Sequence, residues 1–88
     1  MLKLVHLKQF EREAKKAHKR GLDLEKLKKI VEKLANGEKL DPKHRDHPLK
    51  GEFVNYRECH ITPDWLLVYK KTETELILVR TGTHSDLF

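Results

Sequence analysis

The chain has 88 residues, of which 38% are hydrophobic and 38% are charged. A chain of this length predicts one domain, residues 1–88, that buries about two-thirds of the surface its unfolded form exposes, so a functional site should be a shallow groove. The 19 Lys and Arg outnumber the 14 Asp and Glu, which gives a net charge of +5. This excess favours polyanionic partners, although lysine-rich helices also carry such charge simply to stay soluble.

The cysteine and apolar content restrict where the protein acts. Cys59 is the only cysteine in the sequence, which excludes an internal disulfide and any zinc site built from several cysteines. No apolar run is long enough to span a membrane, and the N-terminus lacks the apolar stretch of a signal peptide. We therefore expect a soluble, cytoplasmic protein without a membrane partner.

The first part of the chain predicts a strand followed by two helices. Residues 2–6 are mostly apolar and branched, as expected of a strand that lies against a sheet formed later. Residues 8–20 repeat apolar side chains at helical spacing and stop at Gly21. A second helix follows Asp23, which can cap it, and ends at Gly37. The short connection predicts a helix hairpin whose shared apolar side covers a sheet.

The second part of the chain predicts the sheet itself. Residues 38–51 contain two prolines and no sustained period, so we expect an irregular loop. Residues 53–61 alternate like a strand, and the turn at residues 62–65 leads into an apolar run, residues 65–69, typical of a central strand covered on both faces. A polar reversal then precedes the last strand, residues 76–80. These three strands predict an antiparallel meander.

The predicted fold class is therefore α+β. An N-terminal strand and a helix hairpin pack on an antiparallel sheet, in the order strand, helix, helix, strand, strand, strand. Gly82 allows a sharp bend that returns residues 81–88 to the sheet as a short strand or tail.

The last third of the chain concentrates side chains suited to phosphodiester chemistry. Imidazole takes and gives protons near neutral pH, and a guanidinium matches the charge and geometry of a phosphate. The loop, the turn and the C-terminal residues can bring such groups to one end of the sheet. The groups are His47, Arg57, His60, Asp64, Arg80 and His84. They predict a cleft in which RNA is cleaved by internal attack, with one group removing the 2′-OH proton and another protonating the leaving 5′-oxygen.

Several of these side chains also have a simpler structural interpretation. Asp64 follows Pro63 and would be an ordinary turn residue. Trp65 fits the core better than a platform for stacking on a base, whereas Phe88 at the C-terminus could do either. His44 has no further support, and we expect it to be a solvated surface histidine.

A metal site is another use of such side chains. Four of them are acceptable zinc ligands in type, but their spacing matches no compact zinc signature. Two arginines expected nearby would repel a cation. We therefore predict catalysis without a metal and without a cofactor.

Four segments of the second half stand out in order from His47 to the last residue. They are Asp46-His47-Pro48-Leu49-Lys50-Gly51, Tyr56-Arg57-Glu58-Cys59-His60, Pro63-Asp64-Trp65-Leu66-Leu67-Val68-Tyr69-Lys70 and Arg80-Thr81-Gly82-Thr83-His84-Ser85-Asp86-Leu87-Phe88. Together they strongly resemble the YafQ branch of the RelE-like toxins. The first half agrees with that family in layout but little in specific residues, and the resemblance implies a RelE-like fold.

Toxins of this kind belong to bacterial type II toxin-antitoxin pairs. The resemblance implies an mRNA interferase, a ribosome-dependent endonuclease that cuts mRNA in the decoding site and inhibits translation. It also implies an acid/base set, with base and acid unassigned, at His47, His60, Asp64 and His84. Arg80 would stabilise the transition-state phosphate, and Phe88 would position the RNA. Further candidates for RNA contact are Arg57, Trp65 and Lys50.

The resemblance further implies a cognate antitoxin whose partly disordered segment folds onto the toxin. The complex would bind operator DNA chiefly through the antitoxin. Two alternatives stay open: a noncatalytic domain of this fold that binds RNA or the ribosome, and a protein that acts mainly in the repressor complex. The histidines favour the enzyme, because a pure binding surface would tolerate Lys or Gln at those positions.

Overall fold

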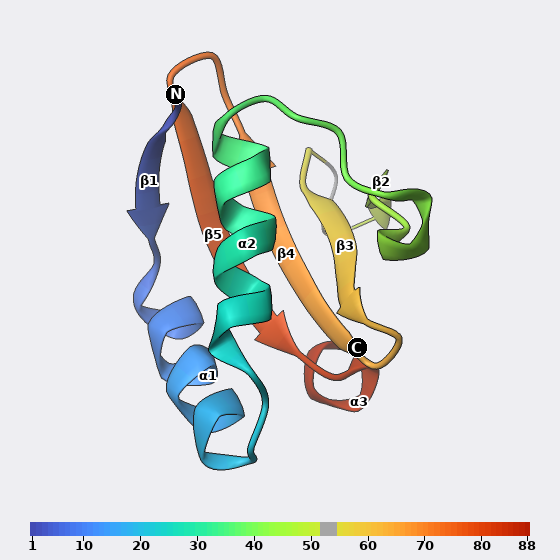
Figure 1. The fold of residues 1–88 in the computed structure, drawn as a ribbon. Coiled ribbons are helices and arrows are strands. Elements are labelled where there is room, and N and C mark those ends of the chain that lie inside the picture. Colours follow the sequence, from blue (N-terminus) through green and yellow to red (C-terminus); the bar gives the residue numbers. More distant parts are fainter. Residues whose placement is uncertain (52–54) are drawn as a thin grey trace.

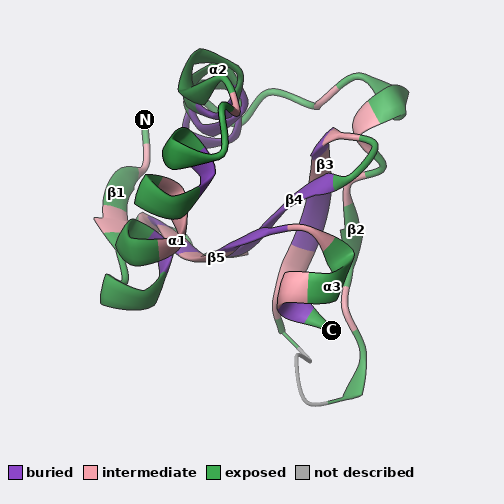
Figure 2. Ribbon diagram, turned by 90° about the horizontal axis from the view of Figure 1, so that it is seen from below, coloured by how far each residue is buried: buried purple, intermediate pink, exposed green. Residues whose placement is uncertain are grey.

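The computed structural model describes residues 1–51 and 55–88. In this part of the chain five strands form one sheet, in the order β1-β5-β4-β3-β2, with α1 and α2 on one face and the short α3 on the other (Figures 1 and 2). The helices are α1 (Lys8–Lys19), α2 (Leu24–Ala35), the 3-10 helix η1 (Pro42–His44) and α3 (His84–Leu87). The strands are β1 (Lys3–His6), β2 (His47–Pro48), β3 (Arg57–Thr62), β4 (Trp65–Lys71) and β5 (Glu75–Gly82).

The predicted helix hairpin is confirmed. The Asp23 carboxylate accepts a hydrogen bond from the Glu25 N–H at 3.0 Å and so caps α2. After α1 the chain turns at Gly21, whose φ of +86° suits glycine, and Gly37 adopts a similar φ of +76° after α2. No helix among the described residues is long and apolar enough to cross a membrane.

Strand β4 holds the two faces of the sheet together. Leu67 and Tyr69 point toward α1 and α2, where the main hydrophobic core lies. Leu66 and Val68 point the other way and pack with Leu87 of α3. All four β4 residues are at most 1% exposed, which confirms the prediction of a central strand covered on both faces.

The sheet is mixed rather than antiparallel throughout, which corrects the expected fold in one respect. Strands β3, β4 and β5 form the predicted antiparallel meander, but β1 pairs in parallel with β5, Val5 lying opposite Ile77. Helix α1 leads away from β1 and α2 returns, so the chain comes back to the starting end of the sheet before it enters the meander. Strands β1 and β5 therefore run in the same direction (Figure 1).

Two further sequence predictions need correction between residues 38 and 62. The loop expected at 38–51 contains η1, capped by Asp41, and β2, which pairs with β3. The strand expected from Phe53 begins later, at Arg57. Phe53 and Val54 lie outside the described residues, and Asn55 has a φ of +79°, which does not fit a strand.

The C-terminal residues form a helix instead of the expected short strand or tail. The Thr83 side chain accepts a hydrogen bond from the Asp86 N–H, and the Asp86 carboxylate accepts one from the Thr83 N–H. This reciprocal capping box starts α3 directly after β5. Gly82 is required at the junction, because a Cβ there would lie 3.0 Å from the Asp86 side chain.

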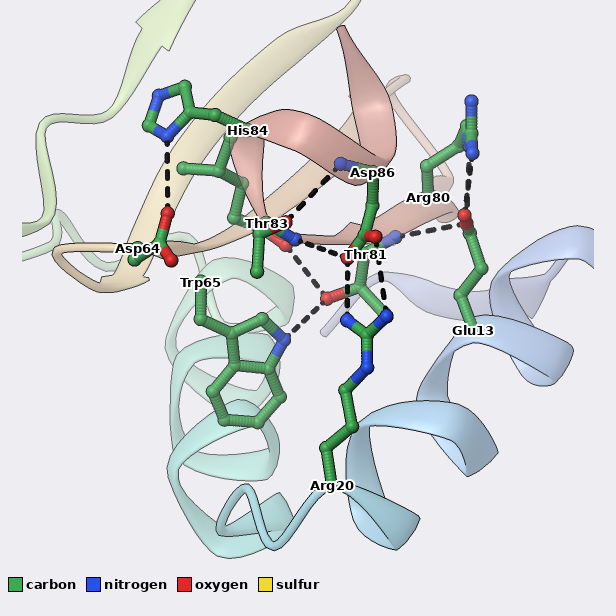
Figure 3. Close-up of polar contacts among 10 residues, drawn as sticks. Glu13, Arg20, Asp64, Trp65, Arg80, Thr81, Thr83, His84 and Asp86 are labelled. Atoms are coloured by element: carbon green, nitrogen blue, oxygen red, sulfur yellow. Dashed lines mark hydrogen bonds and ion pairs between the residues drawn. The ribbon is translucent and has the colours of Figure 1, made fainter.

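Asp86 also ties α3 to the other side of the molecule. The Arg20 guanidinium, from the end of α1, donates to the Asp86 carboxylate at 2.8 Å and 3.4 Å (Figure 3). This hydrogen bond, together with that from the Thr83 N–H, holds the pKa of Asp86 well below its ordinary value. Arg20 and Thr83 thus clamp the carboxylate, and the clamp fixes where α3 begins.

The clamp predicts a pH-dependent difference between the wild type and Asp86→Asn. Because the folded-state pKa of Asp86 is lowered, its contribution to stability is complete above the unfolded-state pKa of about 3.9 and is lost as pH falls through the folded-state value. Thermal unfolding followed by circular dichroism should show a lower melting temperature for Asp86→Asn near neutral pH, and the difference should shrink below about pH 4. A difference that stays constant throughout the acid range would contradict the clamp.

Candidate active site

The structure brings together four of the predicted site residues from four separate segments. His47 lies on β2, His60 on β3, Asp64 in the turn between β3 and β4, and His84 at the start of α3. The ring centroids of His47 and His60 are 6.5 Å apart, and those of His60 and His84 are 5.5 Å apart. Three imidazoles therefore form a row with His60 in the middle.

His47 is held by a buried carboxylate that the sequence analysis did not single out. Its Nε2 lies 3.0 Å from Oε2 of Glu58, the residue opposite it in the β2–β3 pair, and its Nδ1 lies 3.1 Å from the Pro48 carbonyl oxygen. The Glu58 side chain is 7% exposed, and its Oε1 has no hydrogen-bond partner among the described residues. The sequence contains one signal for this residue: Glu58 and His60 are two positions apart in a strand, so their side chains lie on the same face of β3.

The other end of the row faces solvent. Nδ1 of His84 lies 3.7 Å from Oδ1 of Asp64, and both side chains are more than half exposed (Figure 3). The turn at Pro63 and Asp64 joins β3 to β4, so it places the carboxylate beside α3. His84 and Asp64 can therefore reach a bound substrate without any opening of the core.

A second network fixes the segment that carries His47. The Tyr69 hydroxyl donates to the Asp46 carboxylate at 2.6 Å, and the Arg57 Nε donates to the same oxygen at 3.2 Å. Burial and the hydrogen bond to Asp46 raise the pKa of Tyr69, so it stays protonated and continues to donate. Arg57 thus anchors Asp46, the neighbour of His47, and its contacts are within the protein.

Arg80 is not directed at the histidines. Its guanidinium donates to both carboxylate oxygens of Glu13 in α1, at 2.6 Å and 3.2 Å, and this hydrogen bond raises the pKa of Arg80. In Figure 3 the pair lies on the opposite side of α3 from His84 and Asp64. The expected convergence thus joins the three histidines and Asp64, with Arg80 set apart.

The remaining candidates fall into different environments. Trp65 is 1% exposed and donates to the Thr81 hydroxyl at 2.9 Å, so the ring belongs to the core and cannot stack on a base in this structure. Phe88 is 59% exposed at the C-terminus, and Lys50 is exposed at the end of the loop. His44 is half-buried and its Nδ1 lies 2.7 Å from the His60 carbonyl oxygen, so the expectation of a solvated histidine was wrong.

One set of atoms in this site could hold a metal ion. Ligand atoms of His47, Glu58 and His60 all lie within 4.8 Å of one another. Two imidazoles and a carboxylate are the donor types that zinc and copper accept. The unpartnered Oε1 of Glu58 gives such an ion a buried anionic ligand.

The family model described as the bacterial toxin YafQ of type II toxin-antitoxin systems matches residues 2–88. The chain belongs to the YafQ toxin family. A relative named mRNA interferase toxin YafQ, from Escherichia coli strain K12, is 43% identical over 81 residues, which cover 91% of this chain and 88% of that protein.

Two solved structures of bacterial toxins share the whole fold. A copper-bound mutant toxin from Helicobacter pylori is 45% identical and superposes with a TM-score of 0.96, with all of both chains covered. YafQ in the Escherichia coli DinJ–YafQ toxin-antitoxin complex is 40% identical with a TM-score of 0.92, with 99% of this chain and 97% of that chain covered. These likenesses confirm the expected YafQ resemblance and the α+β fold.

Glu58→Gln should separate stability from activity. A buried charge with an unpartnered oxygen is more costly than a buried neutral group, so replacing the carboxylate by an amide of the same shape should leave the free energy of unfolding equal or higher. The change removes the charge that faces His47, and RNA cleavage should fall about tenfold or more. Urea unfolding and single-turnover cleavage measure the two effects.

The matched control for this prediction is Glu32→Gln, which removes an exposed carboxylate from α2. It should change neither property. A Glu58→Gln protein with wild-type cleavage would show that the His47–Glu58 contact has no part in the chemistry.

Proposed function

We propose that this chain is an mRNA interferase that cuts mRNA in the decoding site of the ribosome and so inhibits translation in the cytoplasm. The observation that carries this proposal is the row of three imidazoles with Asp64 at its solvent end. Such a row offers several groups that can exchange protons near neutral pH on one accessible surface. The name of the Escherichia coli relative, mRNA interferase toxin, supports the same activity.

Internal attack on an RNA phosphodiester needs two proton transfers. A base takes the proton of the 2′-OH as its oxygen bonds to phosphorus, and an acid gives a proton to the 5′-oxygen as its bond to phosphorus breaks. His60 and His84 are close enough to act on one phosphate, and Asp64 can orient His84. His47, fixed by Glu58, completes the set.

Positive charge near the phosphate comes from residues around the row. Arg80 stays charged beside Glu13 on the other side of α3 (Figure 3), so it adds positive charge to the field at the phosphate without contacting the histidine row. Phe88 exposes an aromatic ring on which a base can stack, and Lys50 adds charge at the end of the loop. Arg57 acts indirectly through Asp46 and the segment that carries His47.

A transition-metal ion, as in the copper-bound toxin from Helicobacter pylori, would fit His47, Glu58 and His60 in this chain. Bound there, it would supply Lewis acidity and would occupy the nitrogen lone pairs that a base needs. The proton transfers proposed above use the side chains alone, and they require that the imidazoles of His47 and His60 are not bound to a metal ion.

A cognate antitoxin is the expected protein partner. The Escherichia coli relative is found in a complex with the antitoxin DinJ, and this chain matches it over 99% of its length. We infer that an antitoxin of this kind inhibits the protein, and that operator DNA is bound only through the resulting complex.

His84→Ala tests the proposed function directly. With purified protein and ribosomes programmed with a defined mRNA, the wild type should cut the mRNA, and the variant should lose about 100- to 10,000-fold in the rate of cleavage. Ribosome binding, measured by co-sedimentation, should be retained. His18→Ala, which removes an exposed histidine from α1, is the matched control and should cut normally.

Two opposite results would contradict this proposal, the first by rejecting the enzyme and the second by rejecting the role of His84. A wild-type protein that is folded by circular dichroism and binds ribosomes, but leaves mRNA intact, would be a noncatalytic binding domain. Normal cleavage by His84→Ala would place the chemistry elsewhere.

A further inference from the structure

A groove lined by lysines runs between α2 and the part of the molecule formed by η1 and β3. It has a volume of about 440 Å³. Lys26, Lys29 and Lys33 line it from α2, and Lys43 lines it from η1, so both sides carry positive charge. Ile30 and Ile61 contribute apolar surface between them.

The lysines of the groove have no acidic neighbours in its lining. In the part of the chain that the structure describes, the groove is lined by no Asp or Glu. Among the described residues, none of the four lysines takes part in an ion pair, whereas Arg20, Arg57 and Arg80 all do. Four unpaired ammonium groups around one cavity repel one another, and binding of a polyanion relieves that repulsion.

The spacing of the lysines suits an extended strand. Lys26, Lys29 and Lys33 follow one another at intervals of three and four residues, which places them along one side of α2. The helix rises about 1.5 Å per residue, so they span about 10 Å. That length corresponds to about three steps of a stacked nucleic-acid strand, at about 3.4 Å per nucleotide.

The groove adjoins the histidine row. His60 contributes to its lining, and so do Thr62 and Pro63, which lead directly to Asp64. His44 also lines the groove, and its Nδ1 lies 2.7 Å from the His60 carbonyl oxygen. A strand lying in the groove can therefore continue over the β3–β4 turn to His84.

We propose that this groove binds the phosphate backbone of the single-stranded RNA next to the scissile phosphate. Positive charge on both sides and apolar surface between them fit a narrow polyanion with ribose and base faces. Continuity with the histidine row favours RNA over an acidic protein segment, which would have no need to reach His60. The inference rests on the proposed function, because it takes the histidine row as the place of cleavage.

The test compares two sets of three Lys→Gln substitutions in a His84→Ala background, which prevents cleavage. The groove set is Lys26→Gln, Lys29→Gln and Lys33→Gln. The control set is Lys3→Gln, Lys8→Gln and Lys71→Gln, which removes three exposed lysines that do not line the groove. Lys and Gln have similar helix propensities, so α2 should fold normally.

Binding of a short fluorescein-labelled single-stranded RNA is measured by anisotropy over a range of salt concentrations. The groove set should raise Kd about tenfold or more, and it should reduce the slope of log Kd against log salt by about 2, since each lost phosphate contact on a single strand removes about 0.7. The control set should change both quantities much less. Equal effects of the two sets would overturn the proposal.

Two further measurements separate this proposal from its alternatives. If the groove set keeps RNA binding but loses binding to a labelled polyglutamate peptide, the groove takes an acidic protein segment and the proposal is wrong. Cleavage of ribosome-bound mRNA by the protein with His84 intact tests the proposed function separately. If the wild type cuts mRNA but the groove set weakens RNA binding no more than the control set does, the proposal for the groove is wrong and the proposed function stands. If the wild type cuts no mRNA but the groove set loses RNA binding, the proposed nuclease function is rejected. RNA binding by the groove is then still supported.

Discussion

The position of His84 depends on the clamp around Asp86. Strand β5 passes through Gly82 into α3 without a loop, and the clamp sets the direction in which the helix begins. Asp86 accepts from the Thr83 N–H and from Arg20, so one carboxylate joins the sheet end, α3 and the end of α1. His84, the first residue of α3, therefore lies beside His60. The contacts of Asp86 that fix its position are made on the other side of the helix (Figure 3).

The site also contains a buried carboxylate that lowers the stability of the fold and that the fold itself does not require. Glu58 is buried, one of its carboxylate oxygens has no hydrogen-bond partner within residues 1–51 and 55–88, and the other faces His47. A buried acceptor of this kind normally destabilises a small domain, which has little stability to lose. A destabilising group of this kind is expected at functional positions, and it supports the proposal that the β2–β3 pair belongs to the active site.

Sequence patterns predicted the elements whose signals are local. The apolar stripe of α2, the Asp23 cap and the continuous apolar run of β4 each reflect a period or a single residue, and each was confirmed. The predicted meander also placed His60 and Asp64 at the same end of the sheet. Helix α3 differs from the predicted short strand or tail: Thr83 and Asp86 form its capping box, whereas the bend that Gly82 allows does not by itself indicate a helix.

Other features could not be predicted because they depend on contacts between distant residues. The parallel pairing of β1 with β5 leaves no trace in the composition of either strand. Arg80 was expected near the histidines, but its partner Glu13 lies 67 residues away, and only the packing of α1 on β5 brings them together. Two-residue β2 is too short to show a period, and its pairing with β3 decides where His47 points.

The central claim is that the three histidines and Asp64 act as one acid–base unit. Single-turnover cleavage of ribosome-bound mRNA by His60→Ala, His84→Ala and the double variant tests this claim most directly. If the two imidazoles act on the same phosphate, the double variant should cut about as slowly as the slower single variant, since groups that act together lose their effect together. Losses that multiply in the double variant would mean that the two histidines contribute independently, and would contradict the account.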